Sequence, residues 1–239
     1  MNLKDQTVVI IGGGSGIGFG VAQACLARGA RIVLAGRTSS KLERALDALR
    51  ARDRGRAITT DIGQEPDVAR LFEQTQLVDH VVVTAADLAY QPIRDFEVSA
   101  ARRALESKLL GALLVCKHAA RHLNPRGSIT LTSGVASERP LPRGSMVAAV
   151  NGALHSFVRG AALELAPIRV NALSPGWVDS ELWDTLGIDK TAAFSAMAQR
   201  LPAGRIGQPE ELGHAAIFLL ENEFTTGAVL TVDGGHRFA

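Results

Sequence analysis

Residues 7–18 read Thr-Val-Val-Ile-Ile-Gly-Gly-Gly-Ser-Gly-Ile-Gly, and this stretch decides the fold. Five β-branched residues predict a buried strand, the glycines that follow predict a tight turn, and the pattern from Gly16 onward predicts a helix. Such a turn lets the backbone approach a pyrophosphate, which the N-terminal N–H groups of the next helix bind. The strand–turn–helix context favours a dinucleotide site over a plain loop. Its candidate residues are Gly12, Gly14, Ser15, Gly16, Ile17 and Gly18.

The alternation of apolar strands and helical patterns continues on the C-terminal side of this stretch. Further strands are predicted at Arg31–Ala35, Arg56–Thr60, His80–Thr84, Ser128–Thr132, Ile168–Leu173 and Ala228–Val232. The two longest helices are predicted at Ser99–His122 and Met146–Leu165. Continuous apolar strands joined by helices indicate parallel crossovers with both sheet faces covered. We therefore predict an α/β fold: one Rossmann-like domain over residues 1–239, with a doubly wound parallel sheet of about seven strands and a helical substrate lid at about 177–203.

Composition excludes several classes of protein. The chain has 239 residues, of which 46% are hydrophobic and 21% charged, so it is neither disordered nor too small for a core. A net charge of +2 is too small to indicate a nucleic-acid-binding surface. No apolar run approaches the ~18 residues that a membrane span needs. Cys25 and Cys116 fall in predicted helices and form neither a disulfide framework nor a metal spacing. With no signal-peptide pattern at the N-terminus, we expect a cytoplasmic protein without a metal.

The end of the second predicted strand selects the cofactor. An acidic residue there would bind the ribose hydroxyls of NAD, but the chain reads Ala35-Gly36-Arg37-Thr38. The guanidinium of Arg37 suits a 2′-phosphate, so we expect NADP (NADPH) with Arg37 and Thr38 in its site. A surface arginine that merely covers the loop is the alternative. Asp61, after the third strand, would accept from the adenine amino group or serve only as a turn residue.

The order of motifs resembles the short-chain dehydrogenase/reductase family over essentially the whole chain. The matching pieces are Gly12–Gly18, Asp61-Ile62, Ile168–Asn171, Ser174–Val178, Thr226-Gly227 and Val232–Gly235. The resemblance implies a Rossmann-like subunit that forms a homodimer or homotetramer. It also implies that the segment after the sixth strand holds the nicotinamide carboxamide, through Pro175, Gly176, Val178 and Ser180. The family's Asn-Asn-Ala-Gly motif reads Thr84-Ala85-Ala86-Asp87 in this chain. The resemblance implies that Ala85 and Ala86 lie beside the adenosine ribose, with hydrogen bonds that differ from those of the family.

The chain departs from the family at its catalytic positions. The family's Tyr-x-x-x-Lys pair falls on Val147 and Asn151, and valine cannot transfer a proton. No other register restores the pair, because the only tyrosine is Tyr90. The family's active-site asparagine falls on Lys108, whereas its serine is matched by Ser133. The chain thus resembles an atypical member of the family, one in which the nucleotide site is kept.

Four residues are candidates for catalysis: Ser133, Lys108, Tyr90 and Asn151. The hypothesis is that Lys108 and Ser133 together polarise a substrate oxygen, with a lysine pKa lowered by desolvation, and that Tyr90 is the fallback donor. Asn151 would contact the nicotinamide ribose through neutral hydrogen bonds. The alternatives are a solvated Lys108 paired with Glu106 or Asp95, a serine bound to the backbone, and a packed loop tyrosine.

Three further polar sites in the sequence bear on the cleft or on subunit contacts. His155 shares a helix face with Val147 and Asn151, and we expect it to pack against a neighbouring helix or subunit. His236 would reach either a subunit contact or the cleft. The loop Arg139–Arg143 would meet an anionic substrate, although a solvated loop explains its charges equally well.

Two functions stay open at this point. One is an NADP-dependent oxidoreductase, of the carbonyl reductase or alcohol dehydrogenase type, acting on a small molecule with a non-standard acid–base set. The other is an NADP-binding pseudo-enzyme with a regulatory or structural role. The kept glycines and Arg37 fit both, whereas the loss of tyrosine and lysine favours the second and the polar residues around the cleft favour the first.

Overall fold

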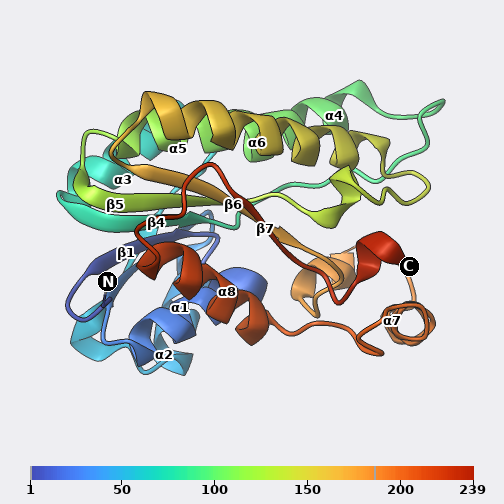
Figure 1. The fold of residues 1–239 in the computed structure, drawn as a ribbon, viewed down its shortest axis with the longest axis horizontal. Helices are drawn as coiled ribbons and strands as arrows, with labels where there is room; N and C mark the ends of the chain where they lie inside the picture. The colour runs from blue at the N-terminus through green and yellow to red at the C-terminus, as the bar shows by residue number, and fades with distance from the viewer. Residues whose placement is uncertain (1, 186) are drawn as a thin grey trace.

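The protein is a single seven-stranded sheet covered by helices on both faces (Figure 1). The structure, a computed structural model, describes residues 2–185 and 187–239. All strand pairs are parallel, in the order β3-β2-β1-β4-β5-β6-β7, which confirms the predicted fold class. The strands are β1 (Thr7–Ile11), β2 (Arg31–Gly36), β3 (Gly55–Thr59), β4 (Val78–Val83), β5 (Leu123–Thr132), β6 (Arg169–Pro175) and β7 (Val229–Val232).

Figure 1 shows α1, α2 and α8 on one face of the sheet and α4, α5 and α6 on the other. The α-helices are α1 (Gly16–Ala27), α2 (Ser39–Ala48), α3 (Glu65–Thr75), α4 (Val98–Ala104), α5 (Gly111–Ala119), α6 (Ser145–Glu164), α7 (Lys190–Ala198) and α8 (Pro209–Glu221). The shorter helical segments are η1 (Arg52–Arg54), η2 (Leu105–Leu110), η3 (Val135–Ser137), η4 (Glu181–Thr185) and η5 (His236–Phe238). None of the described helices combines the length and hydropathy of a membrane span.

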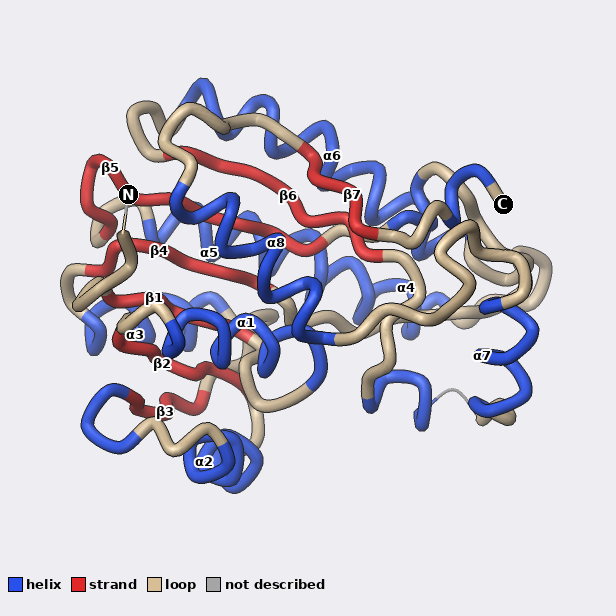
Figure 2. Tube along the Cα trace, turned by 60° about the horizontal axis from the view of Figure 1, so that its bottom comes forward, coloured by secondary structure: helices blue, strands red, loops and turns tan. Residues whose placement is uncertain are grey.

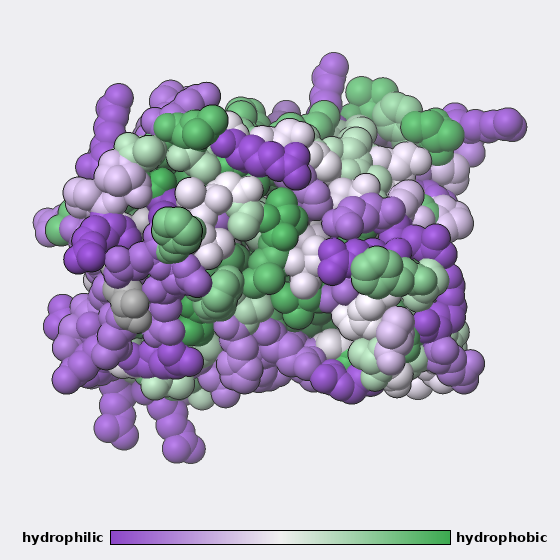
Figure 3. All heavy atoms as spheres, viewed as in Figure 1, coloured by the Kyte–Doolittle hydropathy of each residue, from purple (hydrophilic) through white to green (hydrophobic). Residues whose placement is uncertain are grey.

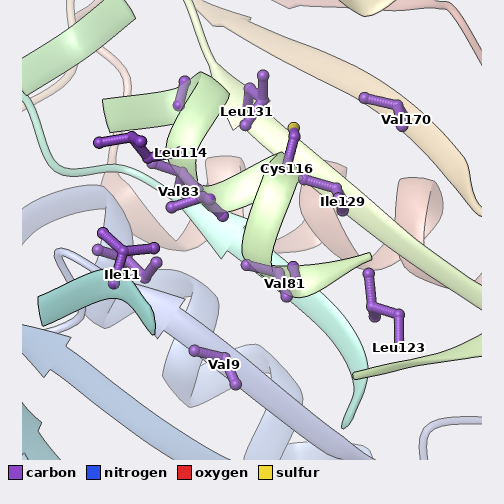
Figure 4. Close-up of a cluster of buried hydrophobic side chains, with 14 of the residues drawn as sticks. Val9, Ile11, Val81, Val83, Leu114, Cys116, Leu123, Ile129, Leu131 and Val170 are labelled. Carbon is purple, nitrogen blue, oxygen red and sulfur yellow. The ribbon is translucent and has the colours of Figure 1, made fainter. Parts of the chain in front are cut away.

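Two hydrophobic clusters lie on opposite sides of the sheet because successive strand residues point to opposite faces. Val8 and Ile10 of β1 pack with α1, α2 and α8, whereas Val9 and Ile11 pack with α3, α5 and α6. Figure 4 shows the second cluster, in which Cys116 of α5 lies among valines and leucines from neighbouring strands. Burial raises the pKa of Cys116 to about 12, so its thiol is a neutral part of the core.

Two elements differ from the sequence prediction. The single helix expected at Ser99–His122 consists of α4, a π-helical turn at η2 and α5, and it ends at Ala119. β5 begins at Leu123 rather than at Ser128, because Leu123 pairs with Val78 across an irregularity in the β4–β5 ladder. The strand therefore includes residues that resemble a turn, and local sequence could not reveal their long-range pairing.

The segment between β6 and α8 forms a closed excursion at the carboxyl edge of the sheet (Figures 1 and 2). Its neck is a backbone bridge, in which Asp179 N donates to Gly207 O and Gly207 N donates to Trp177 O, each at 2.9 Å. Inside it lie η4, α7 and a small core of Met197, Leu201 and Ile206. This is the region expected to be a lid over about 177–203, of which position 186 lies outside the described residues.

Candidate functional site

The candidate site lies where the carboxyl ends of the parallel strands meet, which is where open α/β sheets bind ligands. Figure 1 places α7 and the C-terminal turn at this end of the molecule. The glycine-rich loop after β1, Arg37 after β2 and the segment after β6 all reach the same edge through the sheet order. Among the described residues, no group of three or more metal-binding side chains occurs.

The glycine-rich loop is shaped by contacts that no side chain would tolerate. Gly12 has a φ of +92°, and a Cβ there would lie 2.6 Å from Ala85 N. A Cβ on Gly18 would lie 2.2 Å from Gly12 O, so α1 begins in direct contact with the turn. Ser15 makes no side-chain cap and no acidic residue occupies the first turn of α1. The N–H groups at this helix end are thus free of competing anions, as a pyrophosphate site requires.

The predicted nicotinamide segment lies against this loop. A Cβ on Gly16, whose φ is +50°, would meet only the Ser180 side chain, at 3.1 Å. Gly176 approaches the backbone of Asp233 so closely that a Cβ would lie 2.6 Å from its Cα. Val178 is buried at the neck of the excursion. Gly16 and Ser180, which are distant in sequence, therefore border the same space.

Arg37 is exposed at the end of β2, with no ion pair or side-chain hydrogen bond to any described residue. The neighbouring Lys41 is instead paired with Glu181, at 2.5 Å between Nζ and Oε2. Thr38 is the N-cap residue just before α2, and its side chain makes no capping hydrogen bond. The guanidinium of Arg37 is therefore available to an anionic ligand.

The adenine-side candidates have structural partners of their own. Asp61 Oδ1 accepts a hydrogen bond from Gly63 N at 2.9 Å, the turn role that was the alternative to adenine binding. Ile62 is buried against Gly111, at which a Cβ would lie 2.8 Å from its Cγ1. Ala85 N donates to Ile11 O at 3.1 Å, which fixes the start of the loop that contains Ala86.

Lys108 is a buried lysine, not a solvated one. Its side chain is 7% exposed in the π-helical turn, and Nζ donates to the carbonyl oxygen of Ser133 at 2.9 Å. The structure shows no pairing of Lys108 with Glu106 or Asp95 among the described residues, so the solvated alternative is wrong. Burial lowers the pKa of Lys108 to about 8, in the direction expected from the sequence.

The hydroxyl of Ser133 is not the group that Lys108 contacts. Ser133 Oγ lies 2.9 Å from His155 Nε2 and donates to Leu173 O at 3.3 Å. Lys108 is thus held by the Ser133 carbonyl and not by its hydroxyl, and the hypothesis that Lys108 and Ser133 together polarise a substrate oxygen stays a prediction. His155, expected to pack against another helix or subunit, faces the end of β5, and partial burial lowers its pKa.

Val147 and Asn151 are both buried on the face of α6 that points at the end of β5. A Cβ on Gly134 would lie 2.8 Å from Asn151 Nδ2, so the amide contacts the backbone just after Ser133. Asn151 Oδ1 is buried with no hydrogen-bond partner among the described residues. An orphaned buried acceptor of this kind suits a ligand hydroxyl.

Tyr90 lies in the loop between β4 and α4, where desolvation raises the pKa of its phenol. Arg143 donates to the Tyr90 carbonyl at 3.4 Å, which links this loop to the one before α6. An apolar pocket of about 160 Å³ opens beside it. The lining residues are Ala89, Gln91, Ile93, Phe96, Ala101, Ser145, Met146 and Ala149.

His236 is the residue whose place the sequence left most open. It is 2% exposed, although it lies three residues from the end of the described chain. Its ring stands edge-on to Trp177, with 6.5 Å between ring centroids and an interplanar angle of 88°. The C-terminal turn therefore lies at the carboxyl ends of the strands, beside the candidate site. In the sequence, only the preceding Gly234-Gly235 pair indicates such a turn.

Comparison with known proteins agrees with this geometry. A family model described as enoyl-(acyl carrier protein) reductase matches residues 12–237. The short-chain dehydrogenase/reductase malC of Malbranchea aurantiaca is 33% identical over 250 residues, which cover 98% of this chain and 95% of malC. The cis-4-hydroxycyclohexanecarboxylate dehydrogenase of Sinomonas cyclohexanicum is 35% identical over 248 residues, with 97% and 96% covered. A crystal structure of a small-chain dehydrogenase in complex with NADPH has a TM-score of 0.83 at 31% identity, with 99% and 100% covered.

Proposed function

The chain belongs to the short-chain dehydrogenase/reductase family of oxidoreductases, and from this premise we propose an NADP-dependent enzyme with an unusual proton donor. Its substrate is a small carbonyl compound or the corresponding alcohol. Lys108 takes the role that a tyrosine has in the family. The buried ammonium of Lys108, held by Ser133 O beside Asn151, is the observation that carries the proposal.

The residues at the strand ends fit the proposed cofactor. The uncapped start of α1 would hold the pyrophosphate, and Arg37, which has no partner among the described residues, would hold the 2′-phosphate. Pro175, Gly176, Val178 and Ser180 would border the nicotinamide, and the orphaned Oδ1 of Asn151 would accept from its ribose. The nicotinamide supplies the hydride, whereas binding, orientation and proton transfer fall to this chain.

Replacing Arg37 by Ala is expected to weaken NADPH binding about 10- to 100-fold and to change NADH binding little. Charge-assisted hydrogen bonds to a phosphate are worth about 1.5–3 kcal/mol, and only NADPH has the 2′-phosphate. Titration of each cofactor against the protein measures the two affinities. Arg31→Ala, at the exposed opposite end of the same strand, is the matched control and should change neither. An equal loss for both cofactors in Arg37→Ala would show that this guanidinium does not bind the 2′-phosphate.

Lys108 would act as the general acid in carbonyl reduction. As negative charge develops on the substrate oxygen during reduction, the Lys108 ammonium would donate a proton to it, which would leave a neutral alcohol and a neutral amine. One N–H of Lys108 is bound by Ser133 O, so the others are free to face a substrate oxygen. With a pKa of about 8, the amine regains its proton from water at neutral pH.

A cofactor-binding protein without turnover is the second candidate, because Val147 and Asn151 replace the family's proton-transfer pair. A screen of carbonyls and alcohols that follows NADPH absorbance, beside a cofactor-binding titration, separates the two. Turnover supports the oxidoreductase, whereas binding without turnover supports the second candidate. A relative named as a dehydrogenase of cis-4-hydroxycyclohexanecarboxylate makes small cyclic alcohols and ketones the first compounds to test.

The protein is expected to form a symmetric homo-oligomer through α4, η2 and α6. Several large apolar side chains are exposed on or near these helices: Ile93, Phe96, Val98, Leu105 and Leu110. Figure 3 shows apolar atoms at the upper right, where Figure 1 places α4. Burial of a shared apolar patch by two copies would remove this surface from water. Light scattering at micromolar concentration measures the mass, and a monomer would contradict the expectation.

A further inference from the structure

His236 lies where three separate segments of the chain meet. Its neighbour Gly235 is packed against Pro202, since a Cβ there would lie 2.5 Å from the proline Cγ. Its other neighbour, Arg237, reaches Glu138 in the loop after β5, with 3.9 Å between NH1 and Oε2. The Trp177 ring covers one side of the imidazole. The loop before α6, the excursion after β6 and the C-terminal turn therefore enclose this one side chain.

The imidazole has no hydrogen-bond partner, although it is almost completely buried. Neither Nδ1 nor Nε2 of His236 forms a hydrogen bond with any described residue. Desolvation lowers the pKa of His236, so at neutral pH the ring is uncharged and offers one N–H donor and one acceptor. Native proteins seldom leave buried polar groups unpaired, so this ring points to a partner from outside the chain.

Two unpaired arginines approach the same ring. Arg139 and Arg200 are exposed and form no ion pair or side-chain hydrogen bond with described residues, and their charges lower the pKa of His236 against the larger raising effect of the Asp233 carboxylate. The opposing carboxylate of Asp233 accepts from the backbone N–H groups of Gly235 and Arg237, each at 3.0 Å. Arg237 lies 3.9 Å from both Asp233 and Glu138, so three arginines stand against two carboxylates around the imidazole, and the net formal charge there is positive.

We propose that His236, Arg139 and Arg200 form a subsite for a carboxylate group of the substrate. A planar carboxylate has two acceptor oxygens that match guanidinium forks and one imidazole N–H. Both arginine side chains are exposed and long, so they can turn toward a ligand carboxylate. Trp177, Trp183 and Phe194 pack together next to the subsite and provide an apolar wall for the rest of the molecule.

The proposed subsite rests on the proposed oxidoreductase function in one respect only, namely that it lies beside the nicotinamide segment. A binding experiment can therefore test the subsite without any turnover. The full-length protein, saturated with NADP⁺, is titrated with cyclohexanecarboxylate and with the neutral cyclohexanecarboxamide. Calorimetry and tryptophan fluorescence report binding, and the latter is local because both tryptophans of the chain, Trp177 and Trp183, lie in the aromatic wall. The carboxylate should bind about tenfold tighter than the amide, and added salt should reduce the difference.

Variants separate the subsite from a general effect of charge. Arg139→Gln and Arg200→Gln should each weaken carboxylate binding about tenfold and leave amide binding unchanged. Arg121→Gln removes an exposed charge before β5, at the opposite edge of the sheet, and should alter neither affinity. His236→Asn tests the imidazole, with a thermal melt to show that the variant is folded.

Three results would overturn the proposal: equal affinity for the two probes, no measurable carboxylate binding, or unchanged carboxylate affinity in the Arg139→Gln/Arg200→Gln double variant. Inorganic phosphate in place of the carboxylate, with the same arginine dependence and tighter binding, would also overturn the assignment to carboxylates. Failure of the proposed redox function gives a different pattern, in which the carboxylate binds but no alcohol or carbonyl is turned over.

Discussion

Replacing Lys108 by Met should lower the turnover of carbonyl reduction by about 10²-fold or more, while the affinity for NADPH changes little. Methionine fills a similar volume but cannot donate a proton, and the lysine lies beside Ser133 and Asn151 rather than at the phosphate end of the site. Steady-state kinetics with a substrate from the screen give kcat, and a direct titration gives the cofactor Kd. Because a buried charge is removed, a melting curve should show that the variant is folded.

The pH dependence of the reduction rate tests the role of Lys108 as general acid in a second way. The general acid must be protonated, and burial sets the pKa of Lys108 at about 8, so the reduction rate should fall as pH rises through that value. The Lys108→Met variant should lose this limb of the profile. Tyr90→Phe is the comparison, because the phenol is the other possible donor. Wild-type turnover in Lys108→Met, or a loss confined to Tyr90→Phe, would remove the lysine from the mechanism.

Replacing Gly18 by Ala should lower the free energy of unfolding by about 3 kcal/mol and weaken binding of both cofactors. The added methyl would lie 2.2 Å from Gly12 O and 2.7 Å from Thr84 Oγ1, so the backbone of the loop or of α1 must move. That movement misplaces the N–H groups proposed to hold the pyrophosphate. Chemical denaturation and cofactor titration measure the two effects.

Gly160→Ala is the control for this change. Gly160 lies on the exposed face of α6, where an added Cβ would meet no atom within 4 Å. Alanine there should raise the free energy of unfolding by about 0.5–1 kcal/mol through helix propensity alone. If both substitutions change stability by the same small amount, the tight contact between Gly12 and Gly18 does not constrain the loop.

The sequence predicts the sheet and the nucleotide loop because both depend on local patterns. Apolar β-branched runs, glycines at the end of β1 and helices of regular period specify the strand–turn–helix unit, and the helices between strands indicate parallel pairing, whereas the strand order is known only from the structure. The early start of β5 is missed, since the pairing of Leu123 with Val78 is a long-range contact through residues that look like a turn.

The candidate catalytic residues are found in sequence by their positions, but their contacts are not. Burial of Lys108 comes from the π-helical turn and the approach of β5, neither of which has a periodic signature. The contact between Ser133 and His155 joins residues 22 positions apart and depends on how α6 is rotated over the sheet. His236 is enclosed by segments from three parts of the chain, so only the folded arrangement reveals it.

The backbone bridge between Val178 and Gly207 has an evolutionary consequence. Because the chain leaves and re-enters at nearly one point, α7 inside the excursion can lengthen, shorten or be exchanged without altering β6 or α8, whereas Ser180 near the neck stays constrained by its contact with Gly16. The internal core of Met197, Leu201 and Ile206 moves with α7 as part of the same unit. Mutations that diversify α7 can accumulate without changing the glycine-rich loop, so a descendant of this protein can acquire a new substrate while keeping its nucleotide site.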